Sequence, residues 1–223
     1  MPTTTLETLA RLMAQTTGCP ICHYGRATGH VFLENLLYES VNDFGIRQQL
    51  TQRLGFCALH SREMLQLPGA RLGAAILEQA MLKEALRRLE DLVPARRSLL
   101  GHRRALGSSP PSQQNCLVCE HERQNEIRAI EDLVGHWDDA WAEALENAGG
   151  LCYNHLHQAI RLSPNKTIVA QLKTSHQRLW QTTIARLDAF IRKHDYRFRD
   201  EPIQAEEAQA IHRAIAILTG EDA

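Results

Sequence analysis

The cysteines of this chain fall into two matching sets, and this repeat constrains the fold more than any other feature of the sequence. Each set consists of a C-x-x-C pair followed by a C-x-x-H pair, with 34 residues between the pairs in the first set and 32 in the second. The positions are Cys19, Cys22, Cys57 and His60 in the first copy, and Cys116, Cys119, Cys152 and His155 in the second. Because every cysteine belongs to a set, we interpret the pattern as an internal duplication.

Three cysteines and one histidine per copy indicate metal binding. Thiolate and imidazole are ligands that zinc prefers, and four of them in a tetrahedron form a closed structural site. The pattern therefore predicts two Zn²⁺ sites of the Cys3His type, one in each copy. An iron–sulfur cluster held by the same cysteines is the alternative.

Two other interpretations of the first pair are weaker. Cys19 to His23 spells C-x-x-C-H, which is a haem attachment string, but Glu120 takes the place of this histidine in the second copy. A thioredoxin-like redox pair is expected in a βαβ context, and no strand pattern surrounds either C-x-x-C.

Apolar residues recur at helical spacing between the ligand pairs, as at Ile130, Leu133 and Trp137. We expect a helical hairpin in each copy, with turns near 42–45 and at Gly135, whose two ends meet at the metal. The fold class predicted is all-α: two pseudo-repeated helical lobes, each clasped by a Cys3His site, with long packing helices.

Four segments follow from this pattern. Residues 1–93 would form an N-terminal helix, introduced by a capping box at Thr4, and the first metal-binding lobe. Residues 94–115 are polar and rich in proline and serine, which favours a linker. Residues 116–194 would form the second lobe, and 195–223 an extended segment and a C-terminal helix.

A polar stretch without a counterpart in the first copy, "RKHDYRFRDEP" at 192–202, is a second candidate site. It could bind an anion, with a histidine and an aspartate as a proton-handling pair. The alternative, which we favour, is an interlobe clasp with buried aromatic rings and with arginines paired to nearby carboxylates. The residues concerned are His194, Asp195, Arg197, Arg199 and Asp200.

Composition limits the classes of partner. The formal net charge is −1, so neither nucleic acid nor an anionic membrane is expected as the main partner. An arginine-rich run at 87–104 contains no aromatic residue for base stacking, which also makes nucleic-acid binding unlikely. No secretory signal and no apolar run of about 18 residues is visible, so we expect a cytoplasmic protein. The sequence leaves the oligomeric state open.

The strings "CPIC", "NLLYESVND", "GFCALH" and "KHDYRFRDEP" resemble an uncharacterised bacterial family with paired C-P-x-C and F-C-x-x-H motifs. The resemblance implies a cytosolic bacterial protein with metal ligands, and it does not indicate which activity the protein has. No phosphate-binding loop or nucleophile elbow is present, so we predict no catalytic residue. The leading hypothesis is a zinc-binding helical scaffold for protein interaction or regulation. The alternatives are a redox or sulfur-handling protein, and an anion-binding protein or enzyme that uses the stretch at 192–201.

Overall fold

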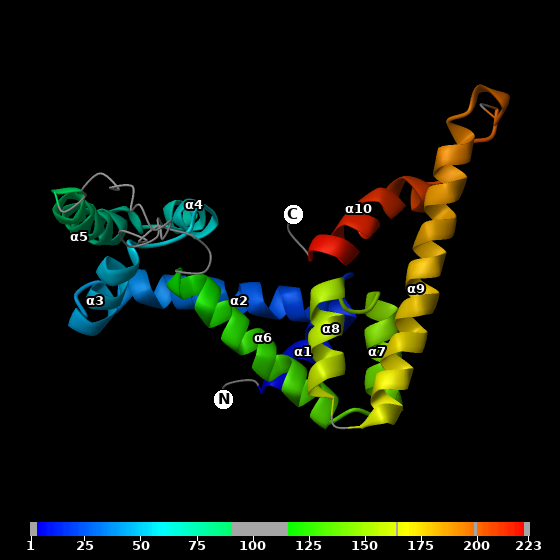
Figure 1. Cartoon of the computed structure of the whole chain (residues 1–223), viewed down its shortest axis with the longest axis horizontal. Helices are drawn as coiled ribbons and strands as arrows, with labels where there is room; N and C mark the ends of the chain where they lie inside the picture. Colours follow the sequence, from blue (N-terminus) through cyan, green and yellow to red (C-terminus); the bar gives the residue numbers. More distant parts are fainter. Residues whose placement is uncertain (1–3, 91–115, 164, 199, 221–223) are drawn as a thin grey trace, which may run out of the picture. The chain divides into compact units, whose positions relative to one another are not determined.

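The computed structural model describes residues 4–90, 116–163, 165–198 and 200–220 (Figure 1). Within these ranges every regular element is a helix, which confirms the predicted all-α class. The elements are α1 (Thr5–Gln15), α2 (Pro20–Tyr38), α3 (Phe44–Arg53), α4 (Ala58–Gln66), α5 (Arg71–Glu90), α6 (Leu117–Gly135), α7 (Asp139–Ala148), α8 (Tyr153–Leu162), α9 (Lys166–Lys193), the short 3-10 helix η2 (Tyr196–Phe198) and α10 (Ala205–Thr219).

The duplication is visible in the order and length of the helices. The run α2–α5 matches the run α6–α9, with 19 residues each in α2 and α6 and 10 each in α3 and α7. The predicted turns are confirmed, because Asp43 and Asp138 each start the shorter helix as its N-cap and accept a backbone N–H with the side chain. Helices α1 and α10 flank the two copies, and the Thr4 capping box starts α1 as predicted.

The chain divides into two compact units that do not simply follow the two copies. Unit 1 contains Met1–Arg26 and Gln124–Ala223, and unit 2 contains Ala27–Arg123. Helices α2 and α6 each begin in one unit and end in the other. The lobes expected from the sequence follow the copies. In the structure, unit 1 contains the first turns of α2 from the first copy, and unit 2 contains the first turns of α6 from the second copy. The predicted linker at 94–115 lies outside the described residues.

Unit 1 is built around α9, its longest helix, with 28 residues. Helices α7, α8 and α10 pack along α9, and α1 packs against α7 (Figure 1). The fully buried side chains of its core include Leu9, Ile130, Leu133, Leu145 and Leu172. Burying a leucine or isoleucine side chain stabilises a fold by about 1.5–3 kcal/mol, so this cluster holds α1, α6, α7 and α9 together.

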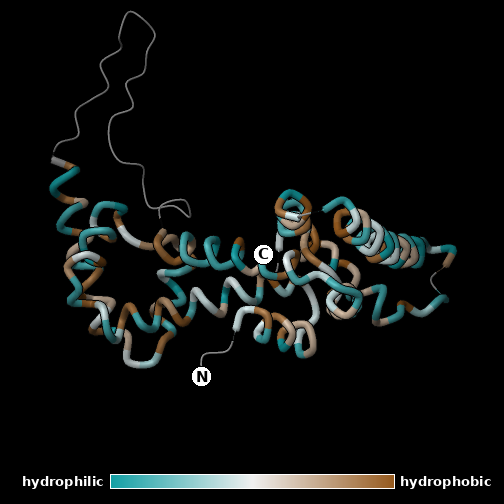
Figure 2. Tube along the Cα trace, turned by 90° about the horizontal axis from the view of Figure 1, so that it is seen from below, coloured by the Kyte–Doolittle hydropathy of each residue, from teal (hydrophilic) through white to brown (hydrophobic). Residues whose placement is uncertain are grey.

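Unit 2 has a smaller core in which α5 packs against α3 and α4. Its fully buried side chains include Leu33, Leu50, Met64 and Leu77. Teal and brown alternate along the helices in Figure 2, as expected where one face of a helix is apolar and the other is polar. Cys19 and Cys116, which directly precede α2 and α6, belong to these cores, so the cores position the candidate metal ligands.

Candidate metal centres

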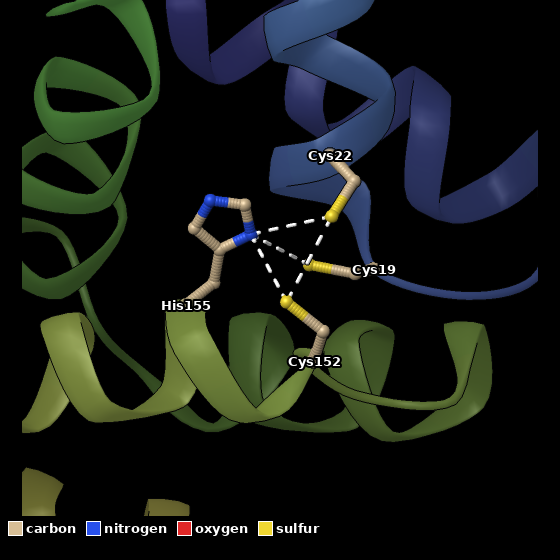
Figure 3. A group of neighbouring side chains, drawn as sticks. All are labelled: Cys19, Cys22, Cys152 and His155. Atoms are coloured by element: carbon tan, nitrogen blue, oxygen red, sulfur yellow. Dashed lines mark hydrogen bonds between the residues drawn. The ribbon is translucent and has the colours of Figure 1, made fainter. Parts of the chain in front are cut away.

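Site A consists of Cys19, Cys22, Cys152 and His155, and all four side chains are buried (Figure 3). The imidazole Nδ1 of His155 lies 3.4 Å from the sulfur of Cys19 and 3.3 Å from the sulfurs of Cys22 and Cys152. The sulfurs of Cys22 and Cys152 are 3.8 Å apart. Four donor atoms thus surround one point, and the group could hold a metal ion.

Site B consists of Cys57, His60, Cys116 and Cys119 and repeats this arrangement. The Nδ1 atom of His60 lies 3.3 Å from the sulfurs of Cys57 and Cys119 and 3.4 Å from that of Cys116. The sulfurs of Cys57 and Cys119 are 3.6 Å apart. Two groups of the predicted Cys3His type are therefore present in the described part of the chain.

The expected pairing within each copy is wrong. Each site combines the C-x-x-C pair of one copy with the C-x-x-H pair of the other, an arrangement we call crossed pairing. The reason is the unequal arms of each helical hairpin. At 1.5 Å per residue, the 19-residue helices α2 and α6 are about 28 Å long, whereas the 10-residue helices that follow are about 15 Å long. The short helix α3 or α7 is therefore too short to bring the C-x-x-H pair back to the C-x-x-C pair at the start of α2 or α6 of the same copy.

Local backbone geometry places each ligand pair at a helix start. Cys19 and Cys116 directly precede α2 and α6, so each C-x-x-C spans the first helical turn. Cys57 and Cys152 are the N-caps of α4 and α8, which puts the histidine three residues later on the same face, as predicted. The turn before each N-cap has two left-handed residues, and in unit 1 both are glycines, Gly149 and Gly150.

A carboxylate orients each ligand histidine. The Nε2 atom of His60 lies 3.1 Å from Glu122, and that of His155 lies 3.4 Å from Glu126. When Nε2–H donates to a carboxylate, the lone pair of Nδ1 points at the three sulfurs, which is the tautomer that a metal requires. Both glutamates come from α6, and neither was predicted as part of a site.

Two glycines of α2 provide the space for these carboxylates. A Cβ atom added at Gly25 would collide with the Glu126 side chain, and one added at Gly29 would collide with Glu122. Gly25 and Gly29 follow the first cysteine of their copy by the same offsets as Glu122 and Glu126 follow Cys116. The two glutamates could therefore have been found from the sequence, because equivalent positions carry glycine in the first copy and glutamate in the second.

In each group one thiolate lies beside an imidazolium, because hydrogen bonds with neighbouring cysteines lower the pKa of Cys116 and of Cys152. Burial alone would lower the pKa of His60, but hydrogen bonds with Cys116 and Glu122 raise it to about 10. Burial acts in the same direction on His155, and hydrogen bonds with Cys152 and Cys22 raise its pKa to about 12. A metal ion at Nδ1 would replace this proton, so binding would release protons.

His176 supports the turn that leads into Cys152. Its Nε2 atom accepts the backbone N–H of Leu151 at 2.8 Å, and its Nδ1–H donates to the Leu172 carbonyl oxygen at 2.7 Å. Both ring nitrogens are thus used, so His176 is a buried residue with satisfied hydrogen bonds. At the equivalent place in unit 2, Met81 packs against Gly55.

The family of unknown function DUF6062 matches residues 7–223. The chain belongs to this family. A similar protein is described as "Uncharacterized 23.9 kDa protein in xynA 3'region" and comes from Caldicellulosiruptor sp. (strain Rt8B.4). It is 24% identical over 206 residues, which cover 91% of this chain and 95% of the relative. No solved structure matches the chain.

The polar stretch of this DUF6062 chain follows the end of α9 in unit 1. Arg197 forms an ion pair with Asp195 at 2.7 Å, and His194 Nδ1 lies 2.8 Å from the Phe190 carbonyl oxygen. The side chain of Tyr196 is 82% exposed, so the expectation that both aromatic residues are buried is wrong. Asp200 is exposed, and Arg199 lies outside the described residues. Anion binding at this stretch stays a prediction.

The arginine-rich run at 87–104 is described only as far as Glu90, and there Arg87 and Arg88 both pair with Glu84. Residues 91–104 of this DUF6062 chain lie outside the described ranges. None of the described helices is long and apolar enough to cross a membrane.

Proposed function

We propose that this protein is a zinc-stabilised helical scaffold that serves protein interaction or regulation without catalysis of its own. The observation that carries the proposal is the pair of Cys3His groups, in which all donor atoms of a group lie within 4.8 Å of one another. Seven of the eight ligand side chains are buried, which is typical of structural rather than catalytic zinc. Four protein ligands fill the tetrahedral coordination of zinc, so no position is left for a substrate or a catalytic water.

The sulfur separations favour a single ion over a cluster. A Zn–S bond of about 2.3 Å at the tetrahedral angle places two sulfurs about 3.8 Å apart. The distances of 3.8 Å in site A and 3.6 Å in site B agree with this value. In an iron–sulfur cluster the four ligands are divided among two or more iron atoms, so donors on different irons would lie further apart than in these groups, where all four donors lie within 4.8 Å of one another.

The test is elemental analysis of anaerobically purified protein, with a visible absorption spectrum of the same sample. We expect about two zinc ions per chain and no colour, since Zn²⁺ has a filled d shell. Cobalt substitution should then give the spectrum of tetrahedral thiolate coordination at both sites. Iron with sulfide and a brown colour would replace the scaffold proposal with the redox or sulfur-handling alternative.

Exposed apolar side chains support the interaction part of the proposal. Leu82, Leu86 and Leu89 lie on one face of α5, at i, i+4 and i+7, and are 65%, 55% and 61% exposed. Cross-linking in cells would compare Leu86→Glu with the control Gln181→Glu, which adds the same charge at an exposed position of α9. We expect only Leu86→Glu to lose cross-linked partners. Equal cross-linking of both variants and wild type would contradict an interaction through α5.

A further inference from the structure

The two sites differ in how well their sulfurs are shielded. In site A every cysteine is buried, and the most exposed of them, Cys22, has an exposed fraction of only 8%. In site B, Cys57 and Cys116 are buried, but Cys119, the counterpart of Cys22, is only partly buried. Cys119 is thus the one ligand among the eight whose side chain is open to solvent.

Helix α10 accounts for the shielding of site A. Gly220, the C-cap of α10, lies so close to Cys22 that an added Cβ would be 3.4 Å from the sulfur. Ala216 and Ile217 line a small gap together with Cys19 and Cys152, and the gap has no room for water. Within the described part of unit 2, no helix corresponds to α10.

The turn that precedes the C-x-x-H pair also has different contacts in the two units. In unit 1 the His176 imidazole accepts the N–H of Leu151, directly before Cys152. In unit 2 the corresponding side chain is Met81, whose thioether is a weak hydrogen-bond acceptor. Site B therefore has a more exposed sulfur and a turn without the imidazole anchor.

We propose that site B is a modification site for peroxide-class oxidants, with Cys119 as the reacting thiolate and Cys57 as its disulfide partner, while site A keeps its metal. This inference rests on the proposed function, because it requires metal at both sites. Oxidation of cysteine follows thiolate character and exposure. A bound metal keeps all of its cysteine ligands as thiolates, so exposure distinguishes them, and among the eight ligands Cys119 is the one that is only partly buried. Cys57 is placed to respond because its sulfur is 3.6 Å from that of Cys119.

The chemistry balances with hydrogen peroxide as the oxidant. The Cys119 sulfur attacks one peroxide oxygen, the O–O bond breaks, and a sulfenic acid and hydroxide form. The Cys57 thiolate then attacks the Cys119 sulfur, the S–O bond breaks, and a second hydroxide leaves. Two electrons pass from the sulfurs to the peroxide, and solvent protons convert both hydroxides to water. The metal ion loses two ligands and is released.

The test uses the full chain with both metals bound, treated with increasing amounts of hydrogen peroxide. A chromogenic chelator reports metal release, and alkylation with mass spectrometry reports which thiols remain. We expect loss of half of the bound metal, together with a Cys57–Cys119 disulfide, before any thiol of site A reacts. Thiol reductant and added zinc should restore the starting state.

The outcomes separate this inference from the proposed function. If the untreated protein holds no metal and binds none when zinc is added, the scaffold proposal fails first. If two metals are present but both sites lose metal at the same rate, or Cys22 reacts before Cys119, only the inference is overturned. A disulfide between Cys116 and Cys119 would overturn the assignment of Cys57.

A pair of variants tests the shielding by α10. Ile217→Ala removes a buried side chain that faces site A, and Ile215→Ala removes a side chain that is 46% exposed on the same helix. Circular dichroism would confirm equal helicity of both variants. We expect alkylation of Cys19 and Cys152, which line the same gap, to become faster in Ile217→Ala alone, approaching the rate at Cys119. An unchanged rate in a folded Ile217→Ala variant would overturn the role of α10.

Discussion

Gly25 and Gly29 lie on the face of α2 against which the Glu126 and Glu122 side chains rest. Alanine is preferred to glycine in a helix interior by about 1 kcal/mol, so two glycines at i and i+4 lower the intrinsic stability of α2. The space beside them is filled by the Glu126 and Glu122 side chains, which reach the ligand histidines. At the scale of the residue, each candidate centre thus depends on a glutamate and a glycine that are not themselves metal ligands.

We predict that Gly25→Ala weakens metal binding at site A. The new methyl group would displace the Glu126 carboxylate from His155, and loss of such an outer partner typically costs about 10–100-fold in metal affinity. Competition with a chromogenic chelator measures the affinity. Gly135→Ala is the control, because a Cβ there meets no atom within 4 Å. Equal affinities of the two variants would contradict this role of Glu126.

His176→Phe should lower the free energy of unfolding by about 1–3 kcal/mol, because the buried N–H of Leu151 loses its acceptor. Denaturant unfolding of the metal-loaded protein measures this loss. His157→Phe, at an exposed position of α8, is the control and should change stability little. A result within error of wild type for His176→Phe would show that water replaces the imidazole.

The same residue predicts a pH dependence. Burial lowers the pKa of His176 below 6.5, its value in an unfolded chain. Below pH 6.5 the unfolded chain therefore takes up a proton before the folded one does. The contribution of His176 is complete above this pH and is lost as the pH falls toward the folded pKa. Wild-type stability should decline more over this range than that of His176→Phe, as measured by denaturant unfolding at several pH values.

At the scale of the element, periodicity and capping signals were sufficient to find the helices. Asp43 and Asp138 mark the starts of α3 and α7, and the ligand spacing at Cys57 and Cys152 gave the starts of α4 and α8. The partner of each ligand pair was not predictable in the same way. It depends on the relative lengths of α2 and α3 and of α6 and α7, which keep the two ends of each hairpin apart.

Cys57→Ser distinguishes crossed pairing from pairing within a copy. Crossed pairing predicts loss of the metal of site B and fast alkylation of Cys116 and Cys119, while Cys19 and Cys22 stay protected. Cys152→Ser is the matched variant and should expose Cys19 and Cys22 instead. Mass spectrometry after brief alkylation reads both patterns. Exposure of Cys19 and Cys22 in Cys57→Ser would contradict the site composition described here.

At the scale of the whole molecule, crossed pairing means that neither copy can complete a site from its own ligands. A single copy could do so only with a second copy, as in a dimer with twofold symmetry. The duplicated chain contains both partners in one polypeptide. The duplication itself was evident from the cysteine spacing, whereas the exchange of ligand pairs follows from three-dimensional contacts between residues more than 50 positions apart.

A cut between the copies should leave two pieces joined by metal. A protease site introduced at 107–115 would separate Cys57 and His60 from Cys116, and Cys22 from Cys152. We expect the cut protein to elute as one species with both metals, and as two species after treatment with chelator and denaturant, because structural zinc contributes about 10–16 kcal/mol per site and the unit 1 core also joins α1 to α7. Size-exclusion chromatography with metal analysis measures this. Recovery of one metal in each separated piece would contradict crossed pairing.

Crossed pairing also sets an order of events during synthesis. Cys152 lies 130 residues after Cys22, and ribosomes add about 5–20 residues per second, so the first pair waits roughly 7 to 26 seconds for its partner. Cys57 and His60 emerge long before that. The first complete Cys3His set on the nascent chain is therefore one that the folded protein divides between two sites. Any metal bound by that early set must exchange two of its four ligands before the chain can finish folding.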